Sequence, residues 1–347
     1  MSRRYGWGII GCGVIAPSHI KGVRENGARA EVVGLYDLVL DRAKERQAEF
    51  DIPFATDDID TFLARDDIDI VSICTPSGAH SDGVVAAAQA GKHILCEKPL
   101  GITHEQLDTA IAAAQEAGVK MGGVFQRRTE PISRQLRHML QEGRFGKIVL
   151  ADLLGKDYRA PEYYQSAGWR GTIRFDRGCL MNQGVHSLDL LLWLMGEPVV
   201  EVAGFWDTLR HDIEAEDTLA ASLRFASGAL GTVVYATSLS RRGVPSHIGI
   251  HGTEGNILLG SRGEEPLVEI GGEPVPLASE RDESANGATQ LVGHAAHVAD
   301  LIQAIDEDRE PAITGESGRS AVDVALAIYE ASDTRTVVRL PLRSTHS

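Results

Sequence analysis

The sequence predicts an α/β protein of two domains. Residues 1–125 would form a doubly wound parallel sheet, and residues 126–347 an α/β domain with a large open antiparallel sheet. Three observations predict this: strand and helix patterns alternate as far as Phe125, a glycine-rich segment joins the first strand to the first helix, and long strand patterns with hairpin turns follow from Val199. Repeated βα units favour a parallel sheet, and successive hairpins favour an antiparallel one.

The segment Tyr5–Ala16 predicts a strand that runs directly into a helix across a G-x-G-x-x-A turn. Gly11 permits the tight turn, Gly13 lets the backbone approach a phosphate, and Ala16 allows the helix to pack closely on the sheet. The N–H groups and dipole at the helix start favour an anionic pyrophosphate. Glycine-rich turns also occur without nucleotides. We take Gly11, Gly13, Val14 and Ile15 as candidate dinucleotide-binding positions of a Rossmann domain.

A second strand pattern, Glu31–Asp37, ends in an acidic residue. Asp37 lies 24 positions after Gly13, close to the ~20 expected for a carboxylate that binds the adenosine ribose hydroxyls. A carboxylate there would repel a 2′-phosphate, and Leu38 stands where an arginine would suit NADP. The sequence therefore favours NAD over NADP as the cofactor. The alternative for Asp37 is a solvated turn residue or a helix cap.

The other first-domain elements follow the same patterns. Strands are expected at Ile68–Thr75, His93–Cys96 and Val119–Phe125, and helices at Gly78–Ala90 and Thr103–Ala117. Thr103 and Gln106 predict a capping box at the start of the last helix. Gly118 is well placed to end that helix.

The second domain mixes helices with long strands. Helices are expected at Pro131–Glu142, Cys179–Met195, Ala295–Ile305 and Arg319–Ala331. Strands are expected at Lys147–Lys156 and in VVEVAGFWDTL, EDTLAASLRFA, ALGTVVYATSL and SHIGIHG. Because VVYATSL is apolar on both faces, one sheet face is expected to meet a neighbouring subunit in a homodimer or homotetramer.

Composition limits the class of protein. The formal net charge of -15 would repel nucleic acid and anionic lipid. No apolar run approaches the ~20 residues of a membrane span, and the N-terminus does not resemble a signal peptide, so we expect a cytoplasmic protein. The four cysteines form no C-x-x-C pair, and no metal site is expected. The cysteines are interpreted as small apolar fillers. Cys12 is nonetheless a candidate for alkylation, because it lies in a loop at a helix start.

Two groups of residues are candidates for the chemistry. Lys98 follows a strand at the sheet edge where doubly wound folds bind ligands; the alternative is an ordinary surface lysine. Asn182 and His186 share one face of a predicted helix, with Asp189 nearby; the alternative for His186 is a hydrogen-bonded core histidine.

The motifs GCGVIA, LYD, CTPSGAH, CEKP, GWRG and MNQGVHSLDLLLWLMG, in this order, resemble those of the Gfo/Idh/MocA family, which includes glucose–fructose oxidoreductase and inositol dehydrogenase. The resemblance covers nearly the whole chain. It implies hydride transfer between a nicotinamide cofactor and a secondary alcohol of a sugar, inositol or nucleotide sugar. It also implies a dinucleotide domain followed by an α/β domain on an open antiparallel sheet.

The resemblance also implies roles for single residues. Lys98 would be the active-site lysine and His186 the catalytic histidine, and Asn182 stands where many relatives carry Asp. Asparagine binds a hydroxyl but holds no proton, so an Asp–His relay is in doubt and Lys98 or His186 becomes the candidate proton acceptor. Residues implied to contact the cofactor are Thr75, Pro76, His80, Glu97, Lys98, Trp169 and Arg170.

The substrate is expected to be a polyhydroxylated ring. Besides Lys98, Asn182 and His186, the candidate contacts are Arg128 and Tyr158, with Arg159, Tyr163, Tyr164 and Trp206 as further aromatic faces and planar donors. Two other functions stay open. The enzyme would be redox-neutral if it cleaved glycosides with NAD retained, and the protein would be a sensor if it bound NAD and sugar without catalysis.

Overall fold

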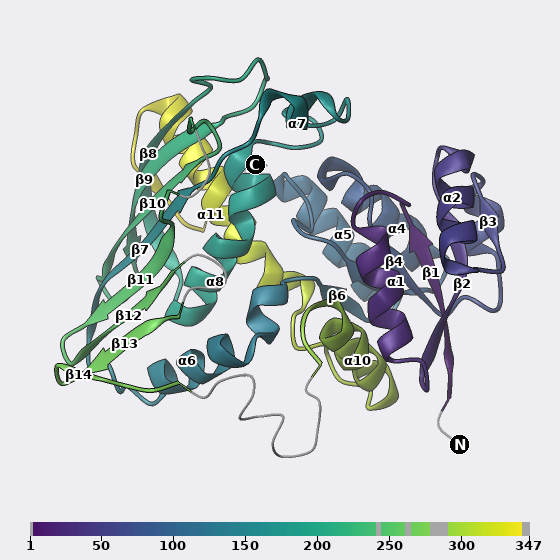
Figure 1. The fold of residues 1–347 in the computed structure, drawn as a ribbon, viewed down its shortest axis with the longest axis horizontal. Coiled ribbons are helices and arrows are strands. Elements are labelled where there is room, and N and C mark those ends of the chain that lie inside the picture. The colour runs from purple at the N-terminus through teal and green to yellow at the C-terminus, as the bar shows by residue number, and fades with distance from the viewer. Residues whose placement is uncertain (1–2, 241–243, 261–264, 278–290, 342–347) are drawn as a thin grey trace. The chain divides into compact units, whose positions relative to one another are not determined.

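A computed structural model describes residues 3–240, 244–260, 265–277 and 291–341 (Figure 1). The chain forms two compact units, Met1–Thr129 with Thr289–Arg319, and Glu130–Ala288 with Ser320–Ser347. The sequence placed the boundary after residue 125 and the whole remainder in the second domain. The structure instead adds the segment around α10 (Gly293–Asp306) to the first unit.

The first unit contains a six-stranded, wholly parallel sheet in the order β3-β2-β1-β4-β5-β6. Its strands are β1 Tyr5–Ile10, β2 Ala30–Tyr36, β3 Ala55–Thr56, β4 Ile70–Ile73, β5 His93–Cys96 and β6 Met121–Gly123. The helical elements of this unit, apart from α10, are α1 Ala16–Glu25, α2 Leu40–Phe50, α3 Ile59–Leu63, η1 Ser77–Ala79, α4 His80–Gln89, α5 His104–Glu116 and η2 Gln126–Thr129. The strand order reverses between β1 and β4, and ligands of doubly wound sheets bind beyond the carboxyl ends of the strands at this point.

Helix α10 joins the first unit because its apolar face completes that unit's core. Val298, Leu301 and Ile302 are buried in the same cluster as Trp7 and Ile20. The Asn26 side chain at the end of α1 also donates to the Ala295 carbonyl at 3.0 Å. The contact spans 269 positions, and helical periodicity predicts only which face of α10 is buried, not the sheet that it covers.

The second unit is built on a nine-stranded sheet in the order β14-β13-β12-β11-β7-β10-β9-β8-β15. Its strands are β7 Ile148–Lys156, β8 Val199–Asp207, β9 Thr218–Phe225, β10 Leu230–Ala236, β11 His247–Gly252, β12 Gly255–Leu259, β13 Leu267–Ile270, β14 Glu273–Pro274 and β15 Val338–Arg339. Neighbouring strands pair antiparallel, as expected, except that β7 and β10 run parallel. The sheet is therefore mixed.

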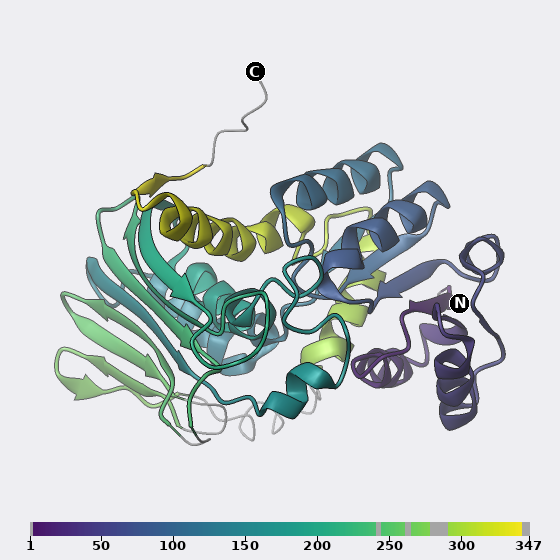
Figure 2. The same cartoon turned by 90° about the horizontal axis from the view of Figure 1, so that it is seen from above.

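Helices cover one face of this sheet. The helical elements are α6 Pro131–Gln141, α7 Pro161–Gln165, η3 Leu180–Gly184, α8 Val185–Met195 and α11 Gly315–Thr334, which starts in the first unit. Helices α8 and α11 lie on the same side of the sheet, and no described element covers its other side (Figure 2). Residues of β9 alternate accordingly: Leu219, Ala221 and Leu223 are buried, whereas Ala220, Ser222 and Arg224 are exposed. In the described part of the chain, no helix is long and apolar enough to cross a membrane.

Candidate active site

The glycine loop between β1 and α1 has the geometry that phosphate binding needs. Gly11 has a φ of +95°, and a Cβ on it would lie 2.8 Å from the Cys74 carbonyl, so only glycine fits there. A Cβ on Gly13 would meet no atom within 4 Å. The backbone at Gly13 therefore borders open space, where a phosphate can approach it. Ala16 is fully buried and lets α1 lie close to the sheet.

The start of α1 is free to receive an anion. Ile15 caps the helix without a side-chain hydrogen bond, and its first turn holds no acidic residue. Val14 beside it is 84% exposed. Backbone N–H groups at a helix start need an outside acceptor, and the helix dipole favours a negative one. These features fit a dinucleotide pyrophosphate at Gly13, Val14 and Ile15.

Asp37 is placed next to this loop, at the end of β2. Its Oδ2 accepts from the Cys12 backbone N–H at 2.8 Å, and its Oδ1 accepts from that of Val39 at 2.9 Å. The side chain is buried, whereas Leu38 is 83% exposed. Asp37 thus keeps a carboxylate beside the turn that the pyrophosphate would occupy. This position suits recognition of ribose hydroxyls.

The loop after β4 offers a further donor. Thr75 Oγ1 is buried and has no hydrogen-bond partner among the described residues. Unpaired buried hydroxyls are costly, so this atom fits a ligand contact. Pro76 precedes the short helix η1. His80 bridges two loops, with Nδ1 2.6 Å from the Pro99 carbonyl and Nε2 2.9 Å from that of Thr75.

Glu97 and Lys98 follow β5 at the same sheet edge. Glu97 is 4% exposed, and its Oε1 lies 3.0 Å from Nε2 of both His19 and His294. Its Oε2 accepts from the Lys98 backbone N–H at 3.1 Å. Neither histidine was among the residues predicted from the sequence. For His19 a signal existed, since it lies three residues after Ala16 on the buried face of α1.

In the second unit, Asn182 lies in a π-helical turn, η3, immediately before α8. The sequence predicted one continuous α-helix over Cys179–Met195. Wider π turns occur often at functional sites. The Asn182 side-chain amide donates to Oδ1 of Asp176, whose Oδ2 accepts from the Gly171 N–H at 2.5 Å. Because the amide nitrogen faces Asp176, the Asn182 oxygen is the atom directed elsewhere.

The His186 side chain is half-buried in the first turn of α8, and Asp189 is buried one turn later. Just before η3, Gly178 has a φ of +101°, and a Cβ on it would lie 1.0 Å from Oε2 of Glu216. Glycine is therefore obligatory at 178.

Glu216 and Asp176 are buried carboxyl groups that were not predicted from the sequence. The partners of Glu216, Leu180 and Tyr329, come from distant segments. Those of Asp176, Gly171 and Asn182, lie close along the chain, but Asp176 itself belongs to no recognisable motif.

Aromatic and cationic side chains of the second unit gather around Trp169 and Arg170. The Arg170 guanidinium lies 4.1 Å from the ring centre of Tyr163 and 4.7 Å from that of Trp169. Tyr163 accepts from the Gln183 side chain at 2.7 Å. A cavity of about 310 Å³ opens beside them, lined by Arg170, Tyr164 and Gln165 among others. Trp206, another of the aromatic residues predicted to contact the substrate, packs against Tyr329, and its indole N–H donates to Asp333.

Two predicted substrate contacts lie in different units. In the first, Arg128 is buried, donates to the Ser317 carbonyl at 3.0 Å and lies over the Phe125 ring. In the second, Tyr158 lies under the Arg210 guanidinium at 5.7 Å. Arg159 contacts Asp157 and the Tyr163 ring. The role of each in binding substrate stays a prediction.

A Rossmann domain with this glycine loop, an acidic β2 terminus and a lysine after β5 defines a dinucleotide-binding protein. Residues 5–124 match the NAD-binding Rossmann fold of the GFO/IDH/MocA oxidoreductase family, and residues 133–258 match a GFO/IDH/MocA C-terminal domain. The chain belongs to this family. It is an NAD-linked oxidoreductase, as the family resemblance implied.

Named relatives extend over almost the whole chain. The WlbA dehydrogenase of Bordetella pertussis, solved with NADH and UDP-GlcNAcA, is 30% identical with a TM-score of 0.87, over 98% of this chain and 100% of that one. The 1,5-anhydro-D-fructose reductase of Ensifer adhaerens is 28% identical over 94% of this chain and 96% of its own. The inositol 2-dehydrogenase of Rhizobium meliloti is 28% identical over 92% and 94%.

Proposed function

We propose that the protein transfers a hydride between NAD and a secondary alcohol of a sugar, inositol, glycoside or nucleotide sugar. The observation that carries the proposal is the open space at Gly13, with the Asp37 carboxylate and the Thr75 hydroxyl on the neighbouring loops. That hydroxyl has no partner in the part of the chain that the structure describes. Bound NAD supplies the hydride acceptor or donor. The relatives support the substrate class, because each is named for a polyhydroxylated ring or was solved with a nucleotide sugar.

Oxidation of an alcohol releases a proton as well as a hydride. Lys98 and His186 are the candidate acceptors of that proton, and general-base catalysis of this kind contributes roughly 10²- to 10⁴-fold to a rate. Asn182 would accept a hydrogen bond from a substrate hydroxyl through its side-chain oxygen, since its nitrogen is held by Asp176. It would orient the substrate and not carry the proton.

The preference for NAD rests on Asp37 and its neighbour. A buried carboxylate with both oxygens on backbone N–H groups stays in place to repel a 2′-phosphate. Leu38 provides no cation in return. We therefore propose NAD as the physiological cofactor.

The test is NADH formation from NAD⁺ over a panel of inositols, aldoses, glycosides and nucleotide sugars. Lys98→Ala and His186→Ala are compared with Lys44→Ala, which removes an exposed lysine of α2. We expect turnover that falls at least about 100-fold in Lys98→Ala and is unchanged in Lys44→Ala. Wild-type turnover in Lys98→Ala would exclude this lysine as the base, and a drop in His186→Ala alone would assign the proton to His186.

The same assay separates the two other functions. Stoichiometric NADH excludes a redox-neutral glycoside-cleaving enzyme. Isotope exchange at a substrate carbon without net NADH would support that enzyme. Binding of NAD and sugar by calorimetry, with neither NADH nor exchange, would favour a sensor.

We also propose that the uncovered face of the nine-stranded sheet binds a second copy of the chain. Leu150 and Leu230, on neighbouring strands of the sheet, are exposed apolar residues. Exposed apolar surface of this kind marks interaction sites. Light scattering should give a dimer or tetramer, and a monomeric mass at micromolar concentration would contradict the proposal.

A cytoplasmic location is the last part of the proposal. All four cysteines are free and buried, which agrees with a reducing compartment. Cell fractionation with an antibody to the protein would test it, and recovery outside the cytoplasmic fraction would exclude it.

A further inference from the structure

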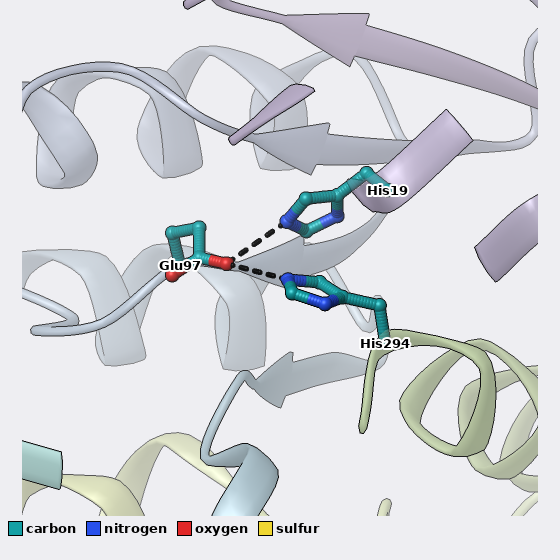
Figure 3. A group of neighbouring side chains, drawn as sticks. All are labelled: His19, Glu97 and His294. Atoms are coloured by element: carbon teal, nitrogen blue, oxygen red, sulfur yellow. Dashed lines mark hydrogen bonds and ion pairs between the residues drawn. The ribbon is translucent and has the colours of Figure 1, made fainter. Parts of the chain in front are cut away.

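Three segments of the first unit converge on the Glu97 carboxylate. His19 of α1 and His294 of α10 both direct Nε2 at Oε1 of Glu97 (Figure 3), and each nitrogen lies 3.0 Å from that oxygen. The Lys98 backbone N–H donates to Oε2 at 3.1 Å. His19 lies 78 positions and His294 197 positions from Glu97. The two imidazole rings meet edge to face, with centres 4.6 Å apart. The carboxylate is therefore held from both ends.

The direction of the hydrogen bonds follows from Trp7, which can only donate. Its indole N–H donates to Ser72 Oγ at 2.8 Å. Within the described chain, the sole acceptor in reach of the Ser72 hydroxyl hydrogen is Nδ1 of His19, at 2.9 Å. His19 therefore accepts at Nδ1 and carries its hydrogen on Nε2, from which it donates to Glu97. Burial lowers the pKa of His19, in agreement with a neutral ring.

Glu97 is the ionised end of this chain. Burial alone would raise the pKa of its carboxyl, but the hydrogen bonds from His19 and His294 hold the pKa well below its usual range. A buried carboxylate is tolerated when every lone pair that faces the protein meets a donor. Here the His19 N–H and the Lys98 N–H provide two of these donors. His294 Nε2, which also lies 3.4 Å from the Gln126 amide nitrogen, provides the third when it carries the ring hydrogen.

Two histidines and a glutamate are also the ligand types of a zinc site, and their ligand atoms lie within 4.8 Å of one another. Zinc needs a lone pair on each nitrogen. The chain from Trp7 puts a hydrogen on His19 Nε2, where zinc would bind. The N–O separations of 3.0 Å are those of hydrogen bonds. The arrangement is therefore complete without an ion.

We propose that His19 and His294 are positioning residues for Lys98. They fix one oxygen of Glu97, so that the other holds the Lys98 backbone and sets the direction of its side chain toward the substrate. Glu97 then supports Lys98 through the backbone of the turn that follows β5. His80 holds the same turn from the other side through the Pro99 carbonyl. The inference rests on the proposed role of Lys98.

The test compares His294→Leu with His294→Gln, because His294 is partly exposed and tolerates change better than the fully buried His19. Leucine keeps the volume and removes the donor, whereas glutamine keeps an N–H near the place of Nε2. We expect kcat per folded molecule to fall about 10- to 100-fold in His294→Leu, as for a misplaced reacting group. The Kd for NAD should be unchanged, and His294→Gln should recover most of the loss.

Three results would overturn the proposal. The first is an unchanged kcat in His294→Leu. The second is a Kd for NAD that rises in step with the loss of kcat, which would mean that the histidines act on NAD binding and not on the position of Lys98. The third is one zinc per chain in the purified protein, by elemental analysis, that is lost in His294→Leu.

A readout without turnover separates this proposal from the proposed function. Acetic anhydride labelling, followed by mass spectrometry, measures the reactivity of Lys98 against exposed Lys44 in the same molecule. We expect His294→Leu to change the rate at Lys98 alone and His294→Gln to restore it. If the labelling follows this expectation while Lys98→Ala retains full activity, then the histidines do position Lys98, and Lys98 is not the catalytic base of the proposed function. Equal rates at Lys98 in all three proteins would reject the positioning.

Discussion

Cys12 and Asp37 are 25 positions apart, and the backbone N–H of the first donates to Oδ2 of the second at 2.8 Å. The glycine loop and the end of β2 are thereby tied together. One carboxylate supports the glycine turn, and under the proposed function the same carboxylate binds the ribose hydroxyls. On that proposal, cofactor choice and loop geometry depend on the same side chain.

This dependence gives a prediction about cofactor preference. The double variant Asp37→Ser/Leu38→Arg removes the charge that repels a 2′-phosphate and adds a cation, so NADP should become a substrate. KM for NAD should rise about tenfold or more, because hydrogen bonds to a charged group contribute about 1.5–3 kcal/mol. Asp37→Asn is the matched control, because it loses the charge and keeps an acceptor for Cys12. An unchanged ratio of kcat/KM for the two cofactors in the double variant would disprove the assignment.

Local sequence patterns were sufficient to predict much of the secondary structure of the first unit. The G-x-G-x-x-A turn, the βα alternation and the acidic end of β2 each concern neighbours in sequence, and Thr103 caps α5 by accepting from the Gln106 N–H. Even there the predicted box differs in detail, since the Gln106 side chain accepts from Ile102 and not from Thr103.

Long-range partners were out of reach of the sequence. Nothing local indicates that His294 meets Glu97 or that α10 completes the first core, because periodicity identifies an apolar face and not its partner. The parallel pairing of β7 with β10 was missed for the same reason. Hairpin signals predict antiparallel neighbours, whereas strands far apart along the chain can pair in either direction.

Asp176 and Asn182 form a pair whose charge can be exchanged. Asn182→Asp alone would place two buried carboxylates next to each other. We expect kcat/KM to fall, and the free energy of unfolding to fall by about 1–3 kcal/mol. Asp176→Asn with Asn182→Asp restores one charge and one donor. Kinetics and urea unfolding of the two single variants and the double variant measure the coupling. Additive losses would show that the pair does not act as a unit.

The cysteines should be inert in the folded protein. Burial, with Asp37 nearby, raises the pKa of Cys12 to about 12, and its Sγ lies 3.6 Å from the Tyr36 carbonyl. The interpretation of the cysteines as small apolar fillers agrees with this burial. The further suggestion that Cys12 is open to alkylation does not, because its thiol is buried although it lies in a loop. Iodoacetamide at pH 8 should label none of the four in the native state and all four in guanidinium. Rapid native labelling of Cys12 would refute its burial.

Glu216 should make stability depend on pH. It is 2% exposed, and burial raises its pKa to about 8 in spite of hydrogen bonds from the Leu180 N–H and the Tyr329 hydroxyl. An unfolded glutamate loses its proton near pH 4.3, so between about 4.3 and 8 the folded state binds more protons than the unfolded state. The free energy of unfolding should therefore fall as pH rises through this window, by up to about 1.4 kcal/mol per pH unit from this group, and level off above pH 8.

Glu216→Gln removes this titration while preserving the shape of the side chain. Urea unfolding from pH 5 to pH 9 should show a flatter profile for Glu216→Gln than for the wild type. The difference should grow as pH rises toward 8, because only the wild-type side chain, ionised in the unfolded state, must take up a proton on folding. Glu273→Gln, at an exposed position of β14, is the control and should leave the wild-type slope intact. Parallel profiles for wild type and Glu216→Gln would mean that Glu216 is ionised in the folded protein at neutral pH, with a counter-charge or water satisfying Oε2.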